Sequence, residues 1–122
     1  MAKVKVDYDY DRQSDSLFIY CIDEYEYDVS LELDKDVIID LDTGGIPVAF
    51  EFLNASKVFR INKNDFNNIL NINIKSNINE KEIHLNVNVL VSIRNKPIDC
   101  DVNRVTSNLS NIPECTSILA TA

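Results

Sequence analysis

The sequence predicts an α+β domain made mainly of antiparallel β-strands, about seven or eight of them, with one or two short helices. Apolar and polar residues alternate with a period of two along most of the 122 residues, which is typical of half-buried strands. The only two glycines, Gly44 and Gly45, lie between two such runs, as expected for a β-hairpin. Helical spacing of apolar residues is confined to residues 53–70.

Each predicted strand follows from its own stretch of alternation. Residues 16–22 (SLFIYCI) are apolar at successive positions, so we expect a central strand that is covered on both faces. In the hairpin, a two-residue loop of Thr43 and Gly44 would place Leu41 opposite Ile46. The predicted strands cover residues 3–10, 16–22, 29–34, 37–41, 46–52, 70–74, 83–93 and 98–102.

One or two short helices are expected between the fifth and sixth strands. Residues 53–59 fit one helical turn, and Asn62 or Asn64 fits the N-cap of a second helix that runs to about Leu70. The hydrophobic content of 45% is enough for a core that needs neither disulfides nor a metal.

The chain divides into one domain and a tail. We assign a single α+β domain to residues 1–106, composed of a core over 1–59 and a helix plus three-strand extension over 60–106. The polar stretch over 107–122 is predicted to be a loosely ordered C-terminal tail.

The charge is strongly acidic and unevenly distributed. The net charge is −8, and residues 1–53 contain fourteen Asp and Glu against four Lys and Arg, whereas residues 54–122 contain six against eight. Nucleic acid and anionic membranes would repel such a domain at long range, so we expect neither as a partner. The acidic half instead suits a basic protein partner.

The cysteines and the single histidine indicate a reducing compartment and no zinc site. Cys21, Cys100 and Cys115 are an odd number at unrelated spacings, and His84 has no companion at ligand spacing. The first residues lack the apolar region of a signal peptide, and no run approaches the length of a membrane helix. We therefore expect a cytoplasmic protein with free thiols and no cofactor.

Two blocks of sequence resemble a family of short uncharacterised prokaryotic proteins known as a domain of unknown function. The first block is YDRQSDSLFI, residues 10–19, and the second is VIIDLDTGGIPVAFEFLNAS, residues 37–56. One position departs from the second block, because Ala49 stands where the family has glycine. The polar and glycine residues that match are Tyr10, Asp11, Asp15, Asp40, Asp42, Gly45, Glu51 and Ser56.

The resemblance implies a fold rather than an activity. It implies a small β-rich unit whose second block is a hairpin that runs into a helical turn, and residues 57–104 resemble the extension of longer archaeal-type members. Some short members resemble the partners of small basic toxins in toxin–antitoxin gene pairs, which implies an antitoxin-like role.

The N-terminal aspartates are weak candidates for a divalent-metal site. Asp7, Asp9, Asp11 and Asp15 occupy positions 1, 3, 5 and 9 of a calcium-loop template. The glycine and the bidentate glutamate of that template are both missing, and Asp7 and Asp9 alternate with core residues as on a strand. The competing interpretation has Asp11 and Asp15 accepting hydrogen bonds from turn amides.

No catalytic constellation is evident. Asp40, Asp42 and Glu51 form a second carboxylate set, but no His, Lys or Arg lies nearby to complete an acid–base site. We therefore expect a non-enzymatic module that binds a basic protein or itself, with a small-ligand or metal-binding domain as the alternative. Asp42 is expected to cap the hairpin turn.

Overall fold

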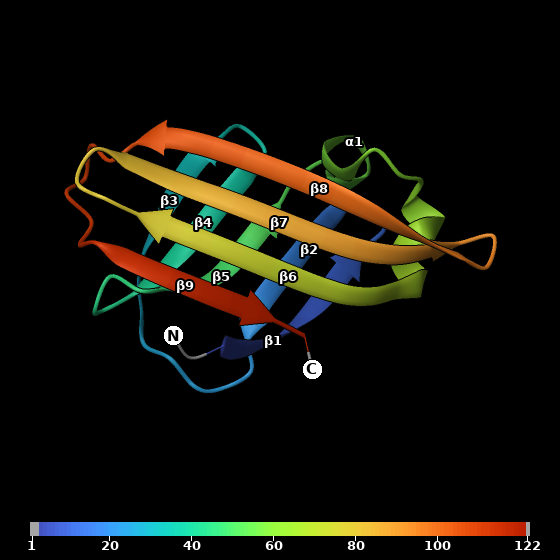
Figure 1. The fold of residues 1–122 in the computed structure, drawn as a ribbon, viewed down its shortest axis with the longest axis horizontal. Helices are drawn as coiled ribbons and strands as arrows, with labels where there is room; N and C mark the ends of the chain where they lie inside the picture. Colours follow the sequence, from blue (N-terminus) through green and yellow to red (C-terminus); the bar gives the residue numbers. More distant parts are fainter. Residues whose placement is uncertain (1–2, 122) are drawn as a thin grey trace.

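The computed structural model describes residues 3–121, and this part of the chain forms nine strands and two short helices (Figure 1). All eight predicted strands are present, and a ninth lies in the predicted tail. Neither helix is long and apolar enough to cross a membrane within these residues. The elements are β1 (Lys3–Asp11), β2 (Ser16–Cys21), β3 (Tyr27–Asp34), β4 (Val37–Asp42), β5 (Pro47–Phe52), α1 (Ala55–Phe59), the 3₁₀ helix η1 (Lys63–Asn68), β6 (Ile69–Ile78), β7 (Glu82–Ile93), β8 (Lys96–Ser107) and β9 (Cys115–Ala120).

The nine strands form one mixed sheet that is folded over on itself. Their order is β3-β4-β5-β2-β1-β9-β6-β7-β8, and every neighbouring pair is antiparallel except β1 and β9. Figure 1 shows β6 to β9 as a front layer that crosses a back layer of β1 to β5. The sheet is therefore a two-layer structure joined along one side by the parallel pair.

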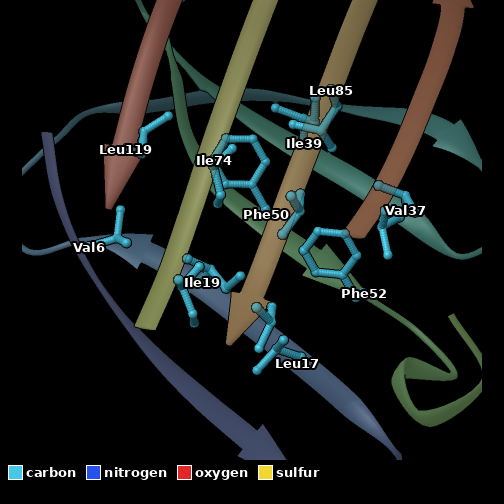
Figure 2. Packing of buried hydrophobic residues seen from close by; sticks show 14 of the residues in the cluster. Val6, Leu17, Ile19, Val37, Ile39, Phe50, Phe52, Ile74, Leu85 and Leu119 are labelled. Carbon is cyan, nitrogen blue, oxygen red and sulfur yellow. The ribbon is translucent and has the colours of Figure 1, made fainter. Parts of the chain in front are cut away.

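The core lies between the two layers. Inward residues alternate along each strand, because successive side chains point to opposite faces of a sheet. Phe50 and Phe52 from the back layer and Ile74 and Leu119 from the front layer are fully buried there (Figure 2). The same cluster includes Leu17, Ile19, Val37, Ile39, Val87 and Val89.

Strand β2 is buried on one face only, which corrects the prediction that both faces are covered. Leu17 and Ile19 are 0% exposed and point into the core. Phe18 and Tyr20 alternate with them, lie on the outer face and are half-buried. The second apolar face of this strand is therefore turned away from the rest of the described chain.

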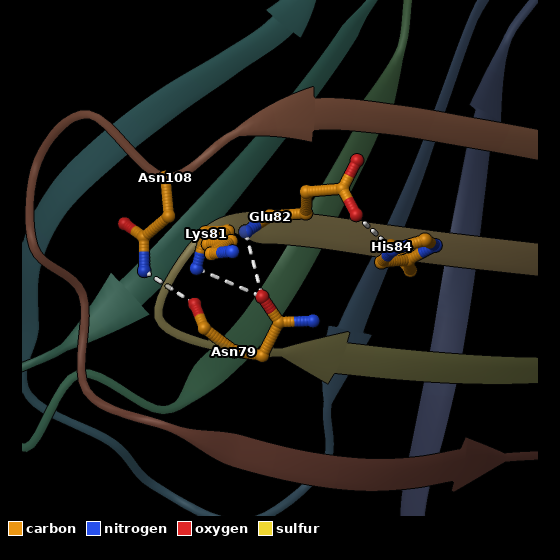
Figure 3. A network of polar contacts seen from close by, with 5 residues as sticks. All are labelled: Asn79, Lys81, Glu82, His84 and Asn108. Atoms are coloured by element: carbon orange, nitrogen blue, oxygen red, sulfur yellow. Dashed lines mark hydrogen bonds and ion pairs between the residues drawn. The ribbon is translucent and has the colours of Figure 1, made fainter.

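The C-terminal stretch contains an ordered strand, which corrects the prediction of a loosely ordered tail. Strand β9 lies inside the sheet, where it pairs with β1 on one side and with β6 on the other. The preceding loop is fastened by Asn108, which is buried and donates from Nδ2 to the carbonyl oxygens of Asn79 and Ile112, both at 2.9 Å (Figure 3). Asn79 in turn caps the β6–β7 turn through the amides of Lys81 and Glu82.

The hairpin of β4 and β5 has a wider turn than predicted, and its register differs accordingly. Val37 pairs with Phe52 and Ile39 with Phe50, with a bulge between Asp40 and Leu41. The cause is the Asp42 side chain, whose Oδ1 accepts hydrogen bonds from the amides of Gly44 and Ile46, each at 2.9 Å. Asp42 thus caps the turn as predicted, but it stabilises a longer loop.

A side chain at Gly45 is expected to destabilise the fold. Its φ of +78° favours glycine, and a Cβ there would lie 3.0 Å from Cδ of Pro113. Gly45→Ala should therefore lower the free energy of unfolding by about 1–2 kcal/mol, measured by urea denaturation. Gly44→Ala is the matched control, because its Cβ would meet nothing closer than 3.4 Å and its φ is not positive. Equal losses in the two variants would contradict this assignment.

Candidate functional site

Three of the family-motif residues converge on one buried carboxylate. Asp15, in the β1–β2 turn, accepts a hydrogen bond from the Tyr10 hydroxyl at 2.7 Å and from the Ser56 amide at 3.0 Å, both through Oδ1. The Ser56 hydroxyl donates to Oδ2 at 2.6 Å. The backbone carbonyl of Asp15 also accepts from the amide of Ala55 at 2.8 Å. The Asp15 anchor, as we call this cluster, ties the turn to the start of α1.

The anchor changes the acidity of its members. Burial alone would raise the pKa of Asp15, but the hydrogen bonds from Ser56 and Tyr10 outweigh it, so the pKa of the carboxyl is lowered. Burial and the hydrogen bond to Asp15 raise the pKa of the Tyr10 hydroxyl. At neutral pH the cluster therefore contains an ionised carboxylate and a neutral phenol.

The anchor is continuous with an aromatic cluster at the end of the core. The Tyr10 ring stacks on Phe66 of η1, with centroids 4.3 Å apart. Phe66 contacts Phe59 of α1 edge to face, and Phe59 contacts Phe52 of β5 in the same way. Such contacts hold both helices against the back layer. The position of the anchor indicates a structural role.

The weak metal candidates are not brought together. Asp9 lies on the outer face of β1, Asp11 accepts a hydrogen bond from the amide of Gln13 at 3.0 Å, and Asp15 points into its anchor. Within residues 3–121 no group of three or more His, Cys, Asp or Glu side chains is placed to hold a metal ion. The predicted turn bond of Asp11 is present, whereas Asp15 bonds to the helix rather than to its own turn.

The second carboxylate set lies on the outer face of the back layer. Asp40 is paired with Ala49 and Glu51 with Ile38, so the two carboxylates occupy neighbouring rows of adjacent strands. Asp40 accepts a hydrogen bond from the Ser30 hydroxyl at 2.6 Å.

These carboxylates belong to a larger surface. In register order across β1, β2, β5, β4 and β3, one row of the outer face contains Asp7, Tyr20, Ala49, Asp40 and Ser30. The next row contains Asp9, Phe18, Glu51, Ile38 and Glu32. Five of the ten side chains are carboxylates and none is basic. We call these two rows the acidic–aromatic face.

An aromatic pair lies on β2, between the carboxylates of β1 and those of β5 and β4. The rings of Phe18 and Tyr20 stack with centroids 5.4 Å apart. Two effects raise the pKa of the Tyr20 hydroxyl. The larger is partial burial, and the smaller is the negative charge of the neighbouring Asp9 and Asp7 carboxylates. Ala49 lies beside Tyr20 and is fully buried although it is on the outer face. The surface thus combines an apolar centre with negative charge on both sides.

The fold is that of a two-layer β protein, and one of its layers carries the acidic–aromatic face. Residues 7–56 match the model of a family described as "Protein of unknown function (DUF2283)", which confirms the resemblance to a domain of unknown function. The match begins within β1 and ends in α1, so it covers most of the back layer and the Asp15 anchor. No curated protein matches the chain, and no solved structure matches it either.

The sequence did not reveal that Phe18 and Tyr20 are on an outer face. Their strand is apolar at successive positions, which fits burial on both sides as well as a binding surface. The acidic residues at alternate positions of β1 are the signal that distinguishes the two cases, because they predict an outward face beside Phe18 and Tyr20 once the strands are paired.

Proposed function

We propose that this chain is a non-enzymatic protein-interaction module that binds a basic protein segment through the acidic–aromatic face. The observation that carries the proposal is the half-buried Phe18–Tyr20 pair, which lies between the carboxylates of Asp7, Asp9 and Glu51. Asp7 and Asp9 are exposed and Phe18 and Tyr20 are half-buried on that face, whereas Leu17 and Ile19 on the opposite face of β2 are 0% exposed. An apolar centre bordered by charge is typical of a protein-binding surface.

The two kinds of side chain would contribute in different ways. The carboxylates would attract a basic partner at long range and speed the encounter. The rings of Phe18 and Tyr20 offer apolar contact area and also a flat π surface on which a Lys or Arg side chain can lie. Together they favour a partner in which basic and apolar residues alternate.

A basic partner is favoured over a second copy of this chain. Two acidic–aromatic faces brought together would oppose carboxylates to carboxylates. The edge strand β3 carries Asp28, Glu32 and Asp34, which disfavour edge-to-edge pairing as well. Small basic toxins, to which the antitoxin-like resemblance points, have the required chemistry.

The test is a capture experiment with charge-matched variants. The tagged chain is exposed to a lysate of its native host at low and moderate salt, and bound proteins are identified by mass spectrometry. We expect the wild type to retain a basic protein at low salt and to lose it as salt rises. Asp7→Lys/Asp9→Lys should reduce recovery at least about tenfold, as expected when attraction becomes repulsion.

The control changes the net charge equally but on the other layer. Glu80→Lys/Asp99→Lys alters two exposed residues of the β6–β7 turn and β8, and it should retain the partner. Phe18→Ala should weaken capture with no change of charge. Recovery of the bait alone, or equal loss in both charge variants, would overturn the proposal.

We also infer a reducing, cytoplasmic environment. The free thiols of Cys21, Cys100 and Cys115 support it. Cys21 and Cys100 are buried, and burial raises the pKa of both thiols, so they pack as small apolar side chains. We further propose that residues 57–104 are the extension found in longer, archaeal-type relatives, which is consistent with a family match that ends at residue 56.

A further inference from the structure

The open side of the folded sheet contains a groove. Strands β3 and β8 are the two ends of the strand order, and they approach each other without pairing. Here a groove of about 490 Å³ lies between the β3–β4 turn, α1 and β8. Its charged lining residues are Lys35, Asp36, Lys57, Arg60, Asp101 and Arg104. We call it the open-side groove.

The lining has the opposite charge balance from the rest of the protein. Four cationic side chains and two carboxylates line the groove, whereas the remainder of the chain has eight Lys and Arg against eighteen Asp and Glu. Lys35, Lys57 and Arg60 form no ion pair with any residue of the described chain. A third of the basic residues of an acidic protein thus meet at one place from three separate elements.

Neither lining carboxylate is hydrogen-bonded to these cations. Asp36 accepts a hydrogen bond from Nδ2 of Asn54 at 2.9 Å. Asp101 accepts one from Nδ2 of Asn88 at 3.0 Å. Both bonds come from amides, so the positive charges of the groove remain available to a ligand.

Arg104 is held in a fixed orientation. Its Nε donates to Oδ2 of Asp34 on β3 at 2.6 Å, and its Nη1 donates to the carbonyl of Asn103 at 2.9 Å. The planar guanidinium keeps further N–H groups for a second acceptor. Arg60, which also lines the groove, is the C-cap that follows α1, and its φ of 59° is a conformation that favours glycine. A long cationic side chain therefore stands where a helix would ordinarily end in glycine.

We propose that the open-side groove binds a small polyanion of the diphosphate class. Its volume falls within the usual range for small-molecule sites. Arginine and lysine are the side chains that recognise phosphate oxygens through charge-assisted hydrogen bonds. A small ligand responds mainly to charges within about one Debye length, roughly 10 Å at moderate salt, so the net charge of −8 does not prevent its binding. The same net charge would repel a long nucleic acid.

The test is a titration of the isotope-labelled full chain with inorganic pyrophosphate, followed by amide chemical shifts in low-salt buffer. We expect saturable shifts confined to the β3–β4 turn, α1 and the Asp101–Arg104 stretch. Lys57→Gln/Arg60→Gln should weaken binding about a hundredfold, because two charged hydrogen bonds are lost and each is worth about a factor of ten. Lys57 and Arg60 are exposed, so the variant should keep the wild-type spectrum elsewhere.

The matched control removes two lysines outside the groove. Lys75→Gln/Lys81→Gln changes the net charge equally, alters exposed residues of β6 and the β6–β7 turn, and should leave the affinity unchanged. Shifts spread over all lysines, or equal weakening by the two variants, would overturn the proposal. So would the absence of saturation at millimolar pyrophosphate. Because the groove and the acidic–aromatic face share no residue, the result is independent of the capture experiment.

Discussion

Replacing Asp15 with alanine is expected to lower the free energy of unfolding by about 3 kcal/mol. The substitution removes three hydrogen bonds to one ionised carboxylate, and it leaves the Ser56 and Tyr10 donors without their acceptor. Urea denaturation at neutral pH measures the loss. Asp11→Ala is the control, because Asp11 is exposed and accepts a single bond from the Gln13 amide, so it should cost less than about 1 kcal/mol. Similar losses in the two variants would contradict the anchoring role of Asp15.

The same carboxylate predicts a pH dependence of stability. The pKa of Asp15 is lower in the folded chain than in the unfolded chain, where it is near its ordinary value of about 4. Its contribution is therefore complete above that value and is lost as the pH falls through the lower, folded pKa. In Asp15→Asn this contribution is absent at every pH, so the free energy of unfolding should fall less steeply below pH 4 than in the wild type. Parallel pH curves for the two proteins would exclude this linkage.

Leu119→Ala is the second substitution with a large expected effect. Leu119 lies on β9, is 0% exposed and packs between the two layers (Figure 2). Its truncation leaves a cavity in the core and should lower the free energy of unfolding by about 3–4 kcal/mol. The loss is measured by thermal or urea unfolding.

Leu109→Ala provides a control with the same chemical change ten positions earlier. Leu109 is 88% exposed, so its truncation should change the stability by no more than about 0.5 kcal/mol. The pair tests the ordered β9 against the loosely ordered tail that the sequence predicts. A tail with no fixed structure would give two small and similar effects.

The strands that the sequence predicts are those in which apolar and polar residues alternate along the whole strand. Ile83 to Ile93, for example, alternates through the whole of β7. Strand β9 was not predicted because its apolar–polar alternation is interrupted. One of its inward positions is Ser117, which is polar yet only 8% exposed. Its assignment depends on pairing with β1 and β6, and such long-range pairing leaves no local pattern. The hairpin register was wrong because the Asp42 carboxylate competed with the expected two-residue loop for backbone amides.

The candidate sites were predictable to different degrees. Tyr10, Asp15 and Ser56 stand in the two blocks of sequence that resemble the family, but nothing in their spacing shows that Asp15 meets a helix 41 residues later. The open-side groove was not predictable, because Lys35, Lys57, Arg60 and Arg104 come from elements that only the folded sheet brings together. Counting charges along the sequence shows that the first half is acidic, but it does not show which basic residues lie together in the folded chain.

The parallel pair of β1 and β9 has a consequence for how the chain folds during synthesis. Lys3 pairs with Ile118, so residues at the two extremes of the described chain must meet before the layers are joined. Until translation has passed residue 120, β1 lacks one neighbour, and the apolar inner face of β2, β4 and β5 lacks its complete cover. Contacts between such distant residues slow folding. Until the last strand emerges, the half-formed sheet therefore exposes an apolar face of the kind that promotes aggregation with other chains.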